Sequence, residues 1–217
     1  MKLETYIDHT NLKPTATETD IRQLCAEAYR HRFRTVCVPP SYVLYASDIL
    51  AGSPVKVCTV IGFPMGYTSL AVKVTEAEKA LEDGATELDV VMNLARFKSM
   101  AYLSVREEIS TLAGLAQSQG ALLKVIIETA YLDDNEIRIA CELCTEAKAD
   151  FVKTSTGFAP AGAEIEQVKL IRSLLPESLQ VKASGGIKTY EQALAFIEAG
   201  ATRIGTSSGV AIVQPAV

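Results

Sequence analysis

Short apolar runs rich in β-branched residues alternate along the chain with longer segments in which apolar residues recur every three or four positions. The short runs predict buried parallel strands, and the longer segments predict the helices that connect them. Eight strands are expected: "YIDHT" from Tyr6, "TVCV" from Thr35, "VKVCTVI" from Val55, "ELDVVM" from Glu87, "LLKVIIE" from Leu122, "FVKTS" from Phe151, "QVKAS" from Gln180 and "RIGTS" from Arg203. Eight such units predict an α/β fold, a (β/α)8 TIM barrel, with an open doubly wound sheet as the alternative.

Helix boundaries support this division of the chain. Thr17 followed by Asp20 has the form of a capping box, so a helix is expected to begin there. Thr189 can cap the start of a helix that Gly200 ends. The segments "AEKALEDGATELDVV" and "EQALAFIEAGATRIGT" both end a helix at Gly-Ala directly before a strand, which indicates one repeated βα unit.

Composition and charge exclude several classes of protein. With 217 residues, 48% of them apolar, one domain spanning residues 1–217 is expected. The 26 acidic and 21 basic residues form no basic block, so neither nucleic acid nor an anionic membrane is an expected partner. No apolar run reaches about 18 residues, and the start "MKLETYIDHT" lacks the order of a signal peptide, so a cytoplasmic protein is expected.

Cysteine and histidine usage argues against a catalytic metal or a redox cofactor. The five cysteines lie mostly within apolar patterns, and reduced, buried thiols are expected. The CxxC pair Cys141 and Cys144 falls within a predicted helix without a second ligand pair nearby. Only two histidines are present, so a zinc site built from several imidazoles is excluded. We therefore expect neither metal nor cofactor.

Charged residues occur on strands that should be buried. In a barrel of this kind, active residues come from the carboxyl ends of strands and the loops that follow them. Because side chains alternate along a strand, an inward Lys153 would bring Phe151 and Ser155 inward and leave Val152 and Thr154 facing the helices. The charged candidates are Asp8, Asp89, Lys124, Glu128, Lys153 and Lys182.

A buried lysine suggests amine chemistry. Desolvation disfavours the ammonium form, and Lys182 on the next strand, about 5 Å away, would lower the pKa of Lys153 further. Asp89 and Asp8 could then move protons. The alternative is a set of structural ion pairs, but lysines on three successive strands, with no arginine among them, favour amine chemistry because arginine is the usual residue for permanent pairs.

Small and hydroxyl-bearing residues follow the last three strands, in "TSTG", "ASGG" and "GTSSG". Glycine lets backbone N–H groups approach an anion, and serine and threonine add donors. Barrels commonly bind phosphate after strands seven and eight. Gly185, Gly186, Ser207 and Ser208 are therefore candidate phosphate ligands, although each glycine-rich piece alone is also ordinary turn chemistry.

The motifs "DHTNLKP", "ELDVVMN", "LLKVIIETAYL", "FVKTSTGF", "VKASGGI" and "IGTSSGVAIV" resemble the deoxyribose-phosphate aldolase family, in the same order over residues 7–213. The resemblance implies a metal-free class I aldolase that reversibly cleaves 2-deoxy-D-ribose 5-phosphate to D-glyceraldehyde 3-phosphate and acetaldehyde.

The resemblance also implies roles for individual residues. Lys153 would form the Schiff base, Lys182 would perturb it and assist proton transfer, and Asp89 would shuttle protons through water. Asp8 and Lys124 would support them, and Gly157 and Gly205 would join the phosphate site. Some members extend further and end in a tyrosine that assists proton exchange, whereas this sequence ends in "VAIVQPAV".

Two other functions stay open at this stage. A phosphosugar isomerase on the same barrel would use a carboxylate, a lysine and a phosphate loop without a Schiff base. A non-catalytic barrel that binds a phosphosugar would need the glycine loops but no desolvated lysine. For the aldolase, a homo-oligomer, either dimer or tetramer, is expected.

Overall fold

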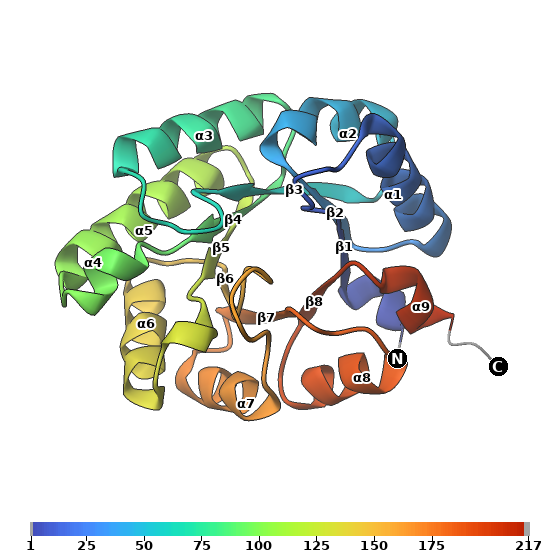
Figure 1. Ribbon diagram of the computed structural model, residues 1–217. Helices are drawn as coiled ribbons and strands as arrows, with labels where there is room; N and C mark the ends of the chain where they lie inside the picture. Colours follow the sequence, from blue (N-terminus) through green and yellow to red (C-terminus); the bar gives the residue numbers. More distant parts are fainter. Residues whose placement is uncertain (1, 215–217) are drawn as a thin grey trace.

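The computed structural model describes residues 2–214, which form a closed barrel of eight parallel strands inside a ring of helices (Figure 1). The strands are β1 (Ile7–Thr10), β2 (Thr35–Val38), β3 (Lys56–Ile61), β4 (Glu87–Val91), β5 (Leu122–Ile126), β6 (Phe151–Lys153), β7 (Gln180–Ser184) and β8 (Arg203–Thr206). Each pairs with the next, and β1 pairs with β8. The predicted (β/α)8 barrel is confirmed, and the β1–β8 pairing excludes the open sheet.

Helices follow the strands and cover the outside of the barrel (Figure 1). They are α1 (Glu18–His31), α2 (Val43–Ile49), α3 (Leu70–Glu82), α4 (Leu94–Lys98), α5 (Tyr102–Ser118), α6 (Asp134–Glu146), α7 (Ile165–Leu174), α8 (Tyr190–Glu198) and α9 (Gly209–Val213), with short 3-10 turns at Leu3–Tyr6, Pro40–Tyr42 and Thr129–Tyr131. None of the helices described is long and apolar enough to cross a membrane.

The expected helix boundaries are confirmed. Thr17 and Asp20 form a capping box at the start of α1, and Thr189 forms one with Gln192 at the start of α8. Gly200 follows the last residues of α8 with a φ of 109°, a left-handed conformation that favours glycine. The next strand begins three residues later, so the short connection fixes where β8 enters the barrel.

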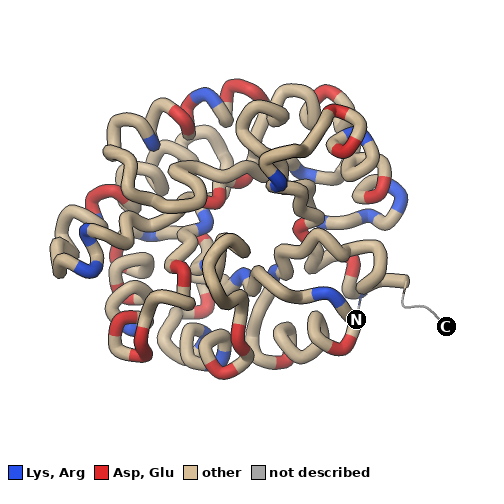
Figure 2. The backbone as a smooth tube through the Cα atoms, viewed as in Figure 1, with Lys and Arg blue, Asp and Glu red and all other residues tan. Residues whose placement is uncertain are grey.

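Two differently composed layers surround the strands. The apolar core lies between the strands and the helices, where residues such as Leu88, Val90 and Val152 are buried. The side chains on the opposite face of the strands point into the barrel, and many of these are charged. Figure 2 shows acidic and basic residues interspersed over the outer helices, without a stripe of one sign.

Candidate active site

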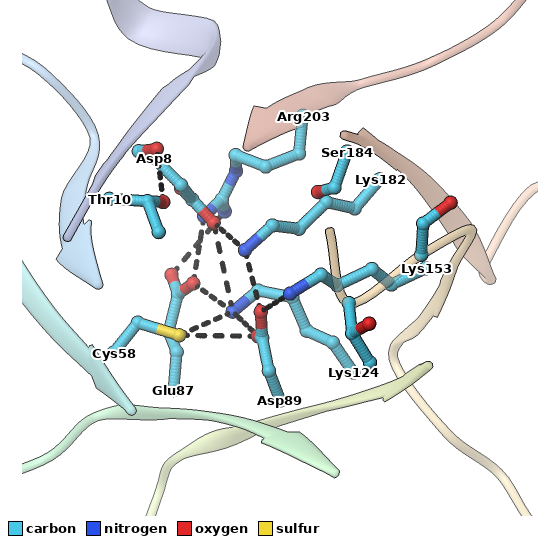
Figure 3. Close-up of polar contacts among 12 residues, drawn as sticks. Asp8, Thr10, Cys58, Glu87, Asp89, Lys124, Lys153, Lys182, Ser184 and Arg203 are labelled. Atoms are coloured by element: carbon cyan, nitrogen blue, oxygen red, sulfur yellow. Dashed lines mark hydrogen bonds and ion pairs between the residues drawn. The ribbon is translucent and has the colours of Figure 1, made fainter. Parts of the chain in front are cut away.

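A cluster of seven charged side chains fills the inside of the barrel (Figure 3). Four are cations and three are carboxylates, and every one is at least 95% buried: Asp8, Glu87, Asp89, Lys124, Lys153, Lys182 and Arg203. If all seven are ionised, the cluster carries one positive charge in excess. Such a group is tolerated only because each charge faces an opposite one at hydrogen-bonding distance.

Asp89 lies at the centre of this cluster. Its Oδ2 atom accepts hydrogen bonds from Lys153 Nζ and Lys182 Nζ, each at 2.7 Å. Its Oδ1 atom accepts from Lys124 Nζ at 2.8 Å. Burial by itself would raise the pKa of Asp89, but the three ammonium groups outweigh burial and hold that pKa well below its usual value. Asp89 is therefore a carboxylate, not a neutral acid.

The strand register explains why Lys153 and Lys182 meet on the same oxygen. The two residues are direct partners across the β6–β7 pair, so their side chains leave the sheet side by side. Phe151, two residues earlier on β6, also faces inward, and its ring lies 5.1 Å from the guanidinium carbon of Arg203. Val152 packs in the outer apolar core. The predicted orientation of β6 is confirmed.

Lys182 is held as a cation by two carboxylates. Its Nζ lies 2.6 Å from Asp8 Oδ2 and 2.7 Å from Asp89 Oδ2. Burial favours the neutral amine, but Asp8 and Asp89 outweigh it and raise the pKa of Lys182 above its ordinary value. Lys182 therefore supplies the fixed positive charge beside Lys153 that the sequence predicted.

Arg203 and Glu87 are two members of the cluster that sequence reasoning missed. Arg203 Nη1 lies 2.7 Å from both Asp8 Oδ1 and Glu87 Oε2, and Lys124 Nζ lies 2.6 Å from Glu87 Oε2. The argument that no arginine joins the buried lysines was therefore wrong. The alternation of side chains along a strand would have identified Glu87, because residues two apart lie on the same face and Asp89 was already placed inside the barrel.

A cavity of about 470 Å³ opens beside this cluster. Of the seven charged residues, only Lys153 lines it. The residues around it come from α1 and from the ends of β1, β6, β7 and β8 with the loops that follow them, and they include Gly157, Gly185, Gly186, Gly205, Ser207 and Lys188. Ser208, a predicted phosphate ligand, is not among the lining residues, and its N–H donates to Thr206 Oγ1 at 2.9 Å.

The glycines beside the cavity serve different purposes. Gly157, Gly185 and Gly186 have φ values of 87°, 93° and 81°, a left-handed backbone conformation that favours glycine. Gly205 is required because no side chain fits there. A Cβ there would collide with Ser184 Oγ and come within 3.0 Å of Lys182 Cε.

Glu128 anchors the loop that follows β6. Its carboxylate accepts hydrogen bonds from the backbone N–H and the hydroxyl of Thr156, and it is 2% exposed. Burial raises the pKa of Glu128, although the Thr156 donors oppose this. The sequence placed Glu128 among the charged candidates without giving it a role, and the structure makes it a support for the loop next to Lys153.

A buried lysine lies between an inner carboxylate cluster and an open cavity, at the carboxyl ends of the strands, where (β/α)8-barrel enzymes have their active sites. Comparison with known proteins gives the family. The DeoC/LacD family aldolase model matches residues 3–215, so the chain belongs to that family and is an aldolase, a carbon–carbon lyase.

Relatives with a named activity cover the chain from end to end. The deoxyribose-phosphate aldolase of Thermococcus gammatolerans is 55% identical over 218 residues, which cover 100% of this chain and 97% of the relative. The enzyme of the same name from Carboxydothermus hydrogenoformans is 52% identical over 98% of this chain and 94% of its own. A solved tetrameric deoxyribose phosphate aldolase from Aeropyrum pernix superposes with a TM-score of 0.91 at 42% identity, covering 97% of this chain and 89% of that one.

Proposed function

We propose that this aldolase reversibly cleaves 2-deoxy-D-ribose 5-phosphate to D-glyceraldehyde 3-phosphate and acetaldehyde through a Schiff base on Lys153, without a metal or cofactor. The observation that carries the proposal is the position of Lys153. Its Nζ atom lies 2.7 Å from the buried Asp89 carboxylate, and its side chain also lines the cavity. A substrate carbonyl in the cavity can therefore reach an amine whose proton acceptors lie behind it.

The chemistry follows from the cluster. Lys153 Nζ adds to the substrate carbonyl, and loss of water gives an iminium ion that accepts the electron pair of the breaking carbon–carbon bond. Asp89 accepts and returns protons during carbinolamine formation and dehydration. Lys182 keeps its charge throughout, so a fixed positive charge lies beside the reacting nitrogen. Asp8 and Lys124 hold Lys182 and Asp89 in place through their ion pairs.

The substrate phosphate is proposed to bind where the loops after β6, β7 and β8 meet. Gly157, Gly185, Gly186 and Ser207 line that part of the cavity, with Gly205 at its edge. Lys188 and Lys13 add two positively charged side chains that the sequence did not single out. Ser208 does not line the cavity and its N–H already donates to Thr206 Oγ1, so its hydroxyl is the group that stays a candidate. Ser184 Oγ is buried without a partner and also lines the cavity, so it is free to donate to the sugar.

The proposal extends to the assembly and location of the protein. We propose a homo-oligomer, because the Aeropyrum pernix relative is described as tetrameric. We also propose a single domain and a cytoplasmic location, because the five cysteines are free and buried. The predicted tail without a tyrosine ends in residues 215–217, which lie outside the described residues.

Borohydride trapping tests the mechanism. The protein is incubated with acetaldehyde and sodium borohydride, and the modified peptide is located by mass spectrometry. We expect one reduced adduct, on Lys153. Lys153→Ala is expected to lose the adduct and all turnover while keeping its fold.

Lys182→Met is the matched control, because it removes a neighbouring ammonium and keeps the nucleophile. This variant should still form the Lys153 adduct, at a lower rate. Turnover without any adduct on Lys153 would favour the isomerase, and ligand binding without turnover would favour the non-catalytic barrel.

A further inference from the structure

Two cysteines lie side by side inside the barrel, next to Asp89. Cys37 on β2 and Cys58 on β3 are direct partners in the strand register, and both are fully buried. Cys58 Sγ lies 3.2 Å from Asp89 Oδ1 and 3.3 Å from Lys124 Nζ. The proposed aldolase chemistry uses neither thiol.

These three side chains have the arrangement of a set of metal ligands. The two sulfur atoms and one Asp89 oxygen all lie within 4.8 Å of one another. Ligand atoms on one zinc tetrahedron lie about 3.5 to 3.8 Å apart, so side-chain movements of less than about 1 Å would complete the geometry. We propose that Cys37, Cys58 and Asp89 bind a soft divalent cation such as Zn²⁺ inside the barrel, and that the bound cation inhibits the aldolase reaction.

The charge balance of the cluster permits this cation. On binding, each thiol releases its proton to solvent and forms a sulfur–metal bond, while the hydrated cation releases water. Two positive charges arrive and two protons leave, so the net charge inside the barrel does not change.

The ion pairs around Asp89 are divided between its two oxygens. Lys153 and Lys182 both bind Oδ2, whereas the thiol of Cys58 is next to Oδ1. Lys124, which also binds Oδ1, has a second carboxylate partner in Glu87 at 2.6 Å. A cation on Oδ1 therefore displaces one lysine contact without leaving that lysine unpaired.

Inhibition follows from the proton chemistry of Asp89, so this part of the inference rests on the proposed function. A carboxylate whose oxygen is bound to a divalent cation is a much weaker base, and it no longer accepts the proton that Lys153 must release. Leu12 both lines the cavity and packs against the cluster that contains Cys37 and Cys58, so its side chain must move for a cation to enter from the cavity.

Metal titration tests the site separately from the activity. Cd²⁺ is added to the chelator-treated wild-type protein, and near-ultraviolet absorption from cadmium–thiolate bonds is recorded. We expect one Cd²⁺ per chain with thiolate ligation, and Zn²⁺ to compete for it. Cys37→Ser and Cys37→Ala are expected to weaken binding at least about tenfold, since removing even a supporting group costs that much.

The control is the other cysteine pair. Cys141 and Cys144 lie on α6, both buried among apolar residues, so the Cys141→Ser/Cys144→Ser variant should bind Cd²⁺ as the wild type does. The inference is overturned if the wild type shows no cadmium–thiolate absorption, or if both Cys37 variants bind with unchanged affinity.

Activity assays then test inhibition. Zn²⁺ should inhibit the wild type, with recovery on adding EDTA, whereas the Cys37 variants should keep their basal rate and lose the sensitivity at the same Zn²⁺ concentration. Binding without inhibition would overturn the inhibitory role alone. A wild type without aldolase activity would refute the proposed function, and the Cd²⁺ titration would still report on the site.

Discussion

Lys153 and Lys188 have different tasks although both are lysines beside one cavity. Lys153 is 3% exposed, is bonded to the Asp89 carboxylate and lines the cavity, which suits the covalent role proposed for it. Lys188 is exposed at the rim, next to Gly185 and Gly186, where a hydrated ammonium attracts an anion. Burial and neighbours separate a nucleophile from a binding group.

Lys188→Met should weaken binding of the phosphorylated substrate selectively. A hydrogen bond to a charged group contributes about 1.5 to 3 kcal/mol, so KM for deoxyribose 5-phosphate should rise about 10- to 100-fold, with a smaller change in kcat. Steady-state kinetics with phosphorylated and unphosphorylated substrates measure this. Lys169→Met is the control, because Lys169 is exposed on α7 and pairs with Glu166. An equal rise in KM for both substrates would show that Lys188 does not bind the phosphate group.

At the scale of elements, neighbouring strands and loops set the positions of the reacting groups. The β7–β8 pair places Gly205 against the Lys182 side chain, and the loop after β6 is fixed through Glu128 at the end of β5. Glu128 itself has a φ of 53°, a left-handed conformation that is unusual for a residue other than glycine. The surrounding contacts hold it there, which indicates that the position of its carboxylate matters.

Gly205→Ala should lower activity without unfolding the barrel. The new methyl group would displace the Lys182 side chain and Ser184 Oγ, so kcat should fall at least about tenfold. Kinetics and a thermal melt measure the two effects. The matched substitution Gly114→Ala lies on α5 with no atom within 4 Å of the new Cβ, and it should leave kcat unchanged and stability equal or up to about 1 kcal/mol higher. Equal kcat in both variants would contradict the packing argument.

Glu128→Gln should loosen the loop after β6. The amide keeps one acceptor oxygen but loses the charge, so the hydrogen bonds to Thr156 weaken by about 1 to 2 kcal/mol. We expect kcat/KM to fall about tenfold, with the borohydride adduct on Lys153 still forming. Thr156→Val, which removes the hydroxyl partner, should produce a similar loss. A normal rate in both variants would mean that the Glu128–Thr156 hydrogen bonds do not position the active site.

At the scale of the whole molecule, the seven residues of the charged cluster link six strands, β1 and β4 to β8, into one network inside a barrel whose apolar core lies outside it. Removing one member leaves a buried partner without its counter-charge, which costs more than the pair contributes when intact. The same network makes the stability of the barrel depend on pH.

Asp8 and Asp89 should make the protein sensitive to acid. Burial raises the pKa of both carboxyls, but Arg203, Lys124, Lys153 and Lys182 outweigh it and lower both pKa values below those of the unfolded chain. Their contribution is complete above the unfolded pKa of about 3.9 and is lost as pH falls through the folded pKa. By pH 3 the free energy of unfolding should drop by about 1 kcal/mol per carboxylate relative to pH 6.

Urea unfolding from pH 6 to pH 3 measures this loss. Asp8→Asn should show a shallower decline, because one of the two carboxyls no longer titrates. Asp134→Asn, on the exposed face of α6, should follow the wild type. A wild-type stability that stays constant down to pH 3 would contradict the assignment of two ionised buried carboxylates.

The sequence by itself determined the barrel, the inward face of β6 and the grouping of Lys153, Lys182 and Asp89. Strand and helix periodicities are local, and in a closed parallel barrel the carboxyl ends of all strands meet, so residues far apart in sequence could be placed together. The family motifs pointed to the same three residues.

Only the tertiary structure decided which charges face one another. Register and side-chain reach brought Arg203 and Glu87 into the cluster, left Ser208 off the cavity wall, and placed Cys37 and Cys58 beside Asp89. Such pairings depend on differences of a few ångströms between strands that are distant in sequence. Local patterns do not encode those differences, because they arise only when the barrel closes.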